Sequence, residues 1–100
     1  MGSPPARTHN QIHWMVVKVR KLGLEDRLRS VCLAYHVELE DVFSRKRFGR
    51  IVRARDACIV KLLAMPMSGP EVGVIMGMDH SSVFAARDRY KERDNGRLQG

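Results

Sequence analysis

Hydrophobic residues recur at helical spacing along most of this chain. Between residues 11 and 22, apolar side chains stand three or four positions apart, and the opposite face carries lysines. This pattern predicts an amphipathic helix over residues 11–22, with Gly23 as its stop. Residues 1–10 contain two prolines, a glycine and mostly polar side chains, so we expect a disordered N-terminus there.

The same spacing predicts three more helices in the next part of the chain. One covers residues 24–36, with Glu25 in its first turn, where an acid interacts favourably with the helix dipole. A short helix follows over residues 37–43. The next covers residues 51–65, and Pro66 ends it because proline cannot continue a helix.

Two predicted helices near the C-terminus are separated by a tight turn. Ser68 is the expected N-cap of the first helix, with Glu71 three residues later as its capping-box partner. This helix stops near Gly77, and the second begins at Asp79 or His80. A short helix, a turn and a helix with polar residues at its start are typical of a helix-turn-helix.

Positive charge is abundant and clustered. Eighteen Lys and Arg against eleven Asp and Glu give a formal net charge of +7. Residues 45–50, the basic loop, contain no acid, and Gly49 indicates a loop or a helix start. Its four cations are Arg45, Lys46, Arg47 and Arg50. Phe48 within it is either an anchor on the core or an exposed wedge.

Arg53 and Arg55 follow in the first turns of the next predicted helix, where a bound anion would compensate their conflict with the helix dipole. Clustered charge of this kind favours a nucleic-acid partner.

Together these patterns predict an all-α fold: a compact helical domain with a helix-turn-helix and an adjacent basic loop. One hundred residues allow one domain and not two. We place the domain at residues 11–93. The last helix runs to about residue 92, and residues 94–100 are expected to form a flexible tail.

The start of the last predicted helix carries the candidate chemistry. Asp79 is expected to cap it by accepting a hydrogen bond from a backbone N–H of the first turn. His80, Ser81 and Ser82 then project from the helix end that is partially positive and suits phosphate. Helix-turn-helix proteins place this end in the DNA major groove. Because contiguous side chains diverge around a helix, they form no catalytic relay, and we expect no enzyme.

Other classes of function lack a signal in the sequence. Two cysteines and four scattered histidines give no metal-site spacing, and no apolar run is long enough to span a bilayer. The glycine-rich phosphate loop of ATPases and a signal peptide are absent. We expect no cofactor, no small-molecule substrate and no membrane partner. Cys32 and Cys58 lie in apolar helical patterns and are expected to be buried thiols in a reducing cytoplasm, with a disulfide as the alternative.

Several motifs carry a family resemblance. Asp79-His80-Ser81-Ser82-Val83 resembles the Asp-His-Thr-Thr-Val signature of the C-terminal, origin-binding domain (domain IV) of the bacterial replication initiator DnaA. Other matching motifs follow the same order, namely Asp41-Val42-Phe43-Ser44, Arg45-Lys46-Arg47, Ala54-Arg55 and Ser68-Gly69-Pro70-Glu71-Val72-Gly73. The resemblance covers about residues 25–92, so we expect a DnaA-domain-IV-like part over residues 24–93 behind an N-terminal helix.

The resemblance implies an all-helical fold with a helix-turn-helix that binds a short AT-containing element, the DnaA box. It places Arg47 where the family inserts an arginine into the minor groove, and Arg55 at a phosphate-contacting arginine. The residues that would touch bases and phosphates in the major groove are Asp79, His80, Ser81 and Ser82.

Three departures from the family pattern change the expected interface. Ser81 and Ser82 replace threonines and lack the methyl group that packs on a thymine methyl. Met78 stands where the family usually has arginine, which removes one phosphate-reaching cation. Asp56 stands where glutamine is common, and we expect its charge to repel the DNA backbone.

We therefore expect sequence-specific binding of double-stranded DNA at DnaA-box-like sites, regulating replication initiation or transcription without an ATPase module. The expected location is the cytoplasm, at a bacterial nucleoid or in a phage-infected cell. The main alternative is a protein-interaction module that binds the replication initiator or its regulators. Trp14 and Met15 would then form its docking surface, although Trp14 is equally consistent with a core position. A third alternative is contact with an acidic membrane through residues 18–21.

Overall fold

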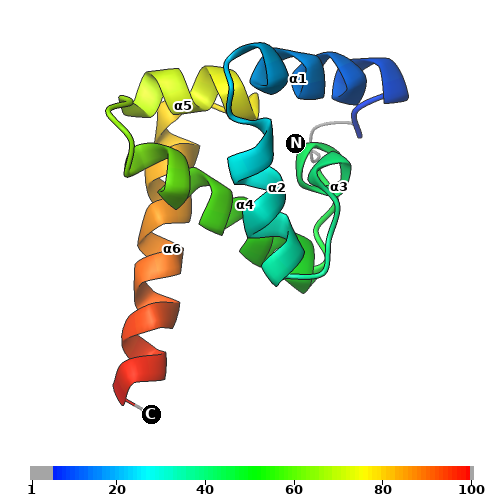
Figure 1. The fold of residues 1–100 in the computed structure, drawn as a ribbon. Helices are drawn as coiled ribbons and strands as arrows, with labels where there is room; N and C mark the ends of the chain where they lie inside the picture. Colours follow the sequence, from blue (N-terminus) through cyan, green and yellow to red (C-terminus); the bar gives the residue numbers. More distant parts are fainter. Residues whose placement is uncertain (1–5, 100) are drawn as a thin grey trace, which may run out of the picture.

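In the computed structural model, the described part of the chain, residues 6–99, folds into six α-helices and contains no strand (Figure 1). The backbone is described throughout this range and the side chains over residues 6–93. The helices are α1 (His9–Lys21), α2 (Glu25–Ala34), α3 (Leu39–Phe43), α4 (Gly49–Leu63), α5 (Gly69–Met76) and α6 (His80–Gln99). The predicted all-α fold is confirmed.

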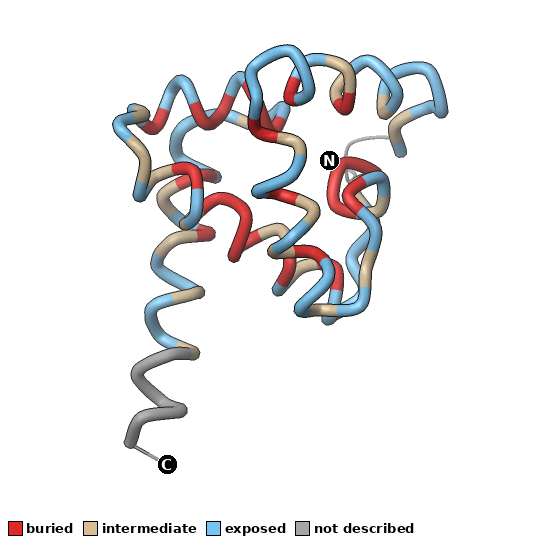
Figure 2. The backbone as a smooth tube through the Cα atoms, viewed as in Figure 1, coloured by how far each residue is buried: buried red, intermediate tan, exposed pale blue. Residues whose placement is uncertain are grey.

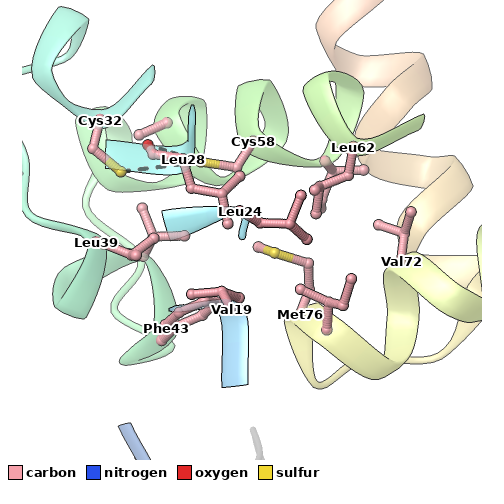
Figure 3. Packing of buried hydrophobic residues seen from close by; sticks show 14 of the residues in the cluster. Val19, Leu24, Leu28, Cys32, Leu39, Phe43, Cys58, Leu62, Val72 and Met76 are labelled. Atoms are coloured by element: carbon pink, nitrogen blue, oxygen red, sulfur yellow. Dashed lines mark hydrogen bonds between the residues drawn. The ribbon is translucent and has the colours of Figure 1, made fainter. Parts of the chain in front are cut away.

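Helix α4 lies at the centre and packs against α2, α3, α5 and α6 (Figure 1). Buried positions concentrate on the inner faces of the helices that surround it (Figure 2). The largest buried side chains include Phe43, Leu28, Leu39 and Leu62, which converge in one cluster (Figure 3). Since burying each such side chain contributes about 1.5–3 kcal/mol, this shared cluster holds the helices together.

The prediction of disorder over residues 1–10 is wrong for residues 6–10. Thr8 caps α1: its Oγ1 accepts a hydrogen bond from the Gln11 amide at 3.2 Å, and the Thr8 amide donates to Gln11 Oε1 at 2.8 Å. Arg7 donates to two backbone carbonyls of the domain. These bonds order the segment despite its polar composition. Residues 1–5 lie outside the described part of the chain.

Several helix ends differ from the sequence prediction by about two residues. Helix α2 ends at Ala34 because His36 takes a left-handed φ of 58°, and the Val37 amide turns back to donate to Cys32 O. Helix α3 correspondingly begins only at Leu39. Helix α4 ends at Leu63, because Pro66 disfavours the helical conformation for the residue that precedes it.

The predicted flexible tail over residues 94–100 is also wrong over residues 94–99, where α6 continues to Gln99. The helix extends away from the other helices at its C-terminal end (Figure 1). No proline follows residue 92 to break it, and Arg93 is tied to α4 by an ion pair. Residue 100 lies outside the described residues.

Asp56 is a fully buried carboxylate on α4. Its Oδ1 accepts from Arg89 Nη2 at 3.0 Å, and its Oδ2 accepts from Arg93 Nη2. Both arginines belong to α6, so this carboxylate joins the two helices. The expectation that Asp56 repels the DNA backbone is therefore wrong, because its charge faces inward and is paired.

The predicted helix-turn-helix consists of α5, a turn at Gly77 and α6. The capping box is confirmed: the Glu71 amide donates to Ser68 Oγ at 3.2 Å, and the Ser68 amide donates to Glu71 Oε1 at 3.1 Å. Gly77 adopts a left-handed φ of 69°, which glycine tolerates without steric cost. The Met78 amide then donates to Gly73 O at 2.9 Å and closes the turn.

Cys32 and Cys58 are free, buried thiols, as predicted, and the disulfide alternative is not present in the structure. Their sulfur atoms lie 4.0 Å apart between α2 and α4 (Figure 3).

Trp14 is 63% exposed on α1, so the interpretation of Trp14 as a core residue is wrong. Within the described residues, no helix is both long enough and apolar enough to cross a membrane.

We predict that Asp56→Ala destabilises the protein by about 3 kcal/mol, because it leaves two arginines without their carboxylate and empties a buried position. Asp88→Ala is the matched control on α6, since Asp88 is 65% exposed and, among the described side chains, pairs only with neighbouring Arg87. It should cost less than about 0.5 kcal/mol. Urea denaturation measures both, and equal losses would contradict the prediction.

We also predict that Gly73→Ala destabilises the protein by about 2 kcal/mol, because a Cβ there would lie 2.5 Å from the backbone oxygen of Met78. The turn would have to open to relieve that overlap. Gly49→Ala is the control: a Cβ at Gly49 meets nothing within 4 Å, so the substitution should be neutral or stabilising by about 0.5 kcal/mol. Thermal unfolding decides, and a neutral Gly73→Ala would show that the turn is not tightly packed.

Candidate nucleic-acid interface

A groove of about 680 Å³ lies between the basic loop and the helix-turn-helix. Arg45, Lys46 and Arg47 line it from the loop, and Arg55 lines it from α4. The opposite side is formed by residues 76–79 together with Ser82. Helix packing brings these segments together: α3 and α5 both pack on α4, and α5 packs on α6.

The basic loop has a defined backbone conformation. Ser44 is the C-cap residue of α3 and donates from Oγ to Asp41 O at 2.6 Å, while the Lys46 amide donates to the same Oγ at 3.3 Å. Arg45 takes a left-handed φ of 68°, which is unfavourable for a residue with a Cβ by roughly 1 kcal/mol. The chain therefore turns sharply at Arg45, and exposed Arg47 follows on the groove wall.

Arg55 on α4 stabilises the basic loop through hydrogen bonds to backbone carbonyls. Its Nε donates to Val42 O at 3.0 Å and its Nη2 donates to Lys46 O at 2.9 Å. The side chain is half-buried, and burial lowers the pKa of its guanidinium from the usual value. Arg55 thus stabilises the carbonyls on both sides of the turn and adds positive charge to the groove.

The first turn of α6 is capped as predicted. Asp79 Oδ1 accepts a hydrogen bond from the Ser82 amide at 2.8 Å, and this bond lowers the pKa of Asp79. The His80 ring is exposed and meets the Phe84 ring edge-on at a centroid distance of 6.3 Å. Ser81 is exposed as well. The helix end is therefore polar, ordered and open to a large ligand.

The structure brings together only part of the predicted site. The groove is shared by Arg45, Lys46, Arg47, Arg55, Asp79 and Ser82. The remaining predicted residues are exposed but do not line the groove, namely Arg50, Arg53, His80 and Ser81. Phe48 is 70% exposed, which rules out the interpretation as an anchor and leaves the exposed wedge.

Arg7 is the groove residue that the sequence analysis missed. It lines the groove beside Arg45 and Arg55, and burial together with these two cations lowers its pKa. The sequence contains one signal for order here, the Thr8-to-Gln11 capping box before the first helix. Nothing in the sequence identifies the partners of Arg7, because they lie far away along the chain.

The arrangement suits a polyanion. Of the side chains that the structure describes, five cations line one groove, and Asp79, the single carboxylate there, is engaged in capping. Among the described residues, no group of three His, Cys, Asp or Glu side chains is placed to hold a metal ion. A cationic groove next to a helix N-terminus binds phosphate through charge and through backbone N–H donors.

Comparison with known proteins identifies a family for this chain. The sequence model described as bacterial DnaA protein helix-turn-helix matches residues 25–89. No curated protein and no solved structure matches the chain significantly. The matched segment contains the basic loop, α4, α5 and the first half of α6. The chain therefore belongs to the family of DnaA C-terminal helix-turn-helix domains, which bind DNA.

Proposed function

We propose that this protein binds double-stranded DNA sequence-specifically at DnaA-box-like sites and regulates replication initiation or transcription. The observation that carries the proposal is the shared groove, in which the basic loop faces the first turn of α6. A recognition helix in the major groove and a loop in the adjacent minor groove read one site together.

Helix α6 supplies the major-groove element. Its first turn exposes His80, Ser81 and Ser82, while Val83 and Ala86 of the same helix are buried against the core. The helix is thus held on its apolar side and presents its polar end outward. Asp79 is retained in the cap, and the three following side chains are available for bases and phosphates.

The basic loop and α4 supply the remaining contacts. Arg47 is exposed at the groove wall and would enter an AT-rich minor groove, whose negative potential attracts arginine. Exposed Arg50 and Arg53 on the first turns of α4 would contact phosphates on either side of that minor groove. Positive charge close to the DNA backbone would come from Arg45, Lys46 and Arg55.

Two sequence departures act in different ways. Met78 packs partly buried against the hydrophobic core, so it stabilises the turn in place of reaching a phosphate. Ser81 and Ser82 keep their hydroxyl donors and acceptors but offer no methyl group to a thymine. We therefore expect weaker preference at thymine positions of the box and an intact electrostatic contribution.

The second candidate function is protein interaction through α1. Trp14 is 63% exposed there, next to exposed His13, whose ring lies 5.3 Å from the Trp14 ring. Large exposed aromatics are enriched in protein interfaces. A replication initiator or one of its regulators is the partner proposed for this surface, and the DNA measurement separates the two candidates.

The first prediction for this function concerns DNA affinity. Fluorescence anisotropy should show tighter binding to a duplex with a DnaA-type box than to a scrambled duplex. The logarithm of the binding constant should fall with log salt with a slope of about −3 to −6, as expected for three to six neutralised phosphates. A binding constant that does not change with salt concentration contradicts the electrostatic argument. No binding at low or at high salt concentration favours the protein-interaction candidate.

A second prediction separates specificity from general affinity. Arg47→Ala should lower the preference for the box by about 1–3 kcal/mol, because it removes the minor-groove contact. Arg53→Ala should weaken binding to box and scrambled duplexes equally and reduce the salt slope by about 1. Anisotropy on both duplexes measures these effects, and equal losses for both variants would contradict this division of roles.

A further inference from the structure

Arg7 precedes α1 and lies outside the segment that the family shares, residues 25–89. Its Nη1 donates to Phe43 O and its Nη2 donates to Gly77 O, each at 2.7 Å. Phe43 is the last residue of α3, separated from the basic loop by Ser44 alone, and Gly77 is the turn of the helix-turn-helix. One planar group therefore connects the two elements of the proposed interface.

The chemistry of this connection is specific to a guanidinium. Both acceptors lie at helix C-terminal ends, where carbonyls lack intrahelical partners and carry partial negative charge. Arginine presents several N–H donors in a rigid fork, so it bridges two carbonyls at once. Within the described part of the chain, no carboxylate forms an ion pair with Arg7. Its contacts are therefore to the backbone that it joins.

The packing at Gly77 supports the same view. A Cβ placed on Gly77 would collide with Arg7 Nη2, so the turn and the arginine fit closely against each other. Arg7 is also partly buried, with Arg45 and Arg55 nearby. Like-charged neighbours make the position costly, and the two carbonyl bonds offset that cost.

We propose that Arg7 is a positioning residue that fixes the separation of the basic loop and the first turn of α6, so that both elements meet one DNA site. The proposal rests on the proposed function, because it concerns the same interface. Recognition groups must be held within about 0.5 Å of the productive geometry to act together. A tether between the two elements meets this requirement, and it comes from a segment outside the shared family domain.

The experiment uses Arg7→Ala and Arg7→Lys, each alone and combined with Arg47→Ala. Lys61→Ala is the charge-matched control, since Lys61 is exposed and lines a different surface with Asp26 and Arg27. Anisotropy on box and scrambled duplexes at two salt concentrations gives the preference for the box. Amide hydrogen exchange of the DNA-free proteins reports on the connection between α3 and α4, residues 44–48, and on the turn, residues 77–79.

We expect Arg7→Ala to lower the box-to-scrambled affinity ratio by about tenfold, as is typical of energetically coupled residues. In the Arg47→Ala background, the same change should have little further effect on the ratio, because the loop no longer reads the site. Arg7→Lys should not restore the ratio, since an ammonium lacks the fork. Amide exchange should accelerate in both segments for Arg7→Ala and stay unchanged for Lys61→Ala.

Three results would overturn the proposal. The first is an unchanged ratio in Arg7→Ala. The second is equal loss on both duplexes with a smaller salt slope and rescue by lysine, which would make Arg7 a phosphate contact. The third is unchanged amide exchange in both segments. If the wild-type protein does not prefer the box, the proposed function is overturned instead. The amide exchange rates alone then show whether Arg7 tethers the two segments.

Discussion

The buried carboxylate of Asp56 determines how the two ends of the proposed interface are related. It sits on α4, whose first turn includes the end of the basic loop, and binds Arg89 and Arg93 on α6, the proposed recognition helix. A buried charge is costly unless it is paired, so this position favours a single arrangement of the two helices. The direction of α6 relative to the basic loop follows from that arrangement.

Two arginines refine this arrangement at the groove itself. Arg55 holds the loop through the carbonyls of Val42 and Lys46, and Arg7 connects the end of α3 to Gly77. Both use guanidinium groups on backbone carbonyls that no helix hydrogen bond satisfies. The groove thus combines cations with a structural role and exposed ones, such as Arg47, that are open to solvent at its wall. Positive charge in the sequence alone does not distinguish these two roles.

Much of the local structure is predictable from sequence, because its causes lie within a few residues. The Ser68–Glu71 capping box, the stop at Gly77 and the Asp79 cap all occur where the pattern predicts them. Predictions failed where distant contacts decide. Residues 6–10 are ordered by carbonyls of α3 and of the turn, and Arg93, the first residue beyond the predicted end of the last helix, is paired with Asp56. The expected repulsion between Asp56 and the DNA backbone is wrong for the same reason, since the burial of Asp56 is not visible in its local sequence.

The sequence by itself determined the helical class, the helix-turn-helix and the family, because apolar spacing, capping residues and short motifs are local features. Tertiary structure alone decided which charges face a ligand and which are paired inside the protein. Arg55 and Arg93 look alike in sequence, yet one supports the groove and the other neutralises a buried acid. The physical reason is that a charge takes its role from the groups packed around it, and those groups come from distant parts of the chain.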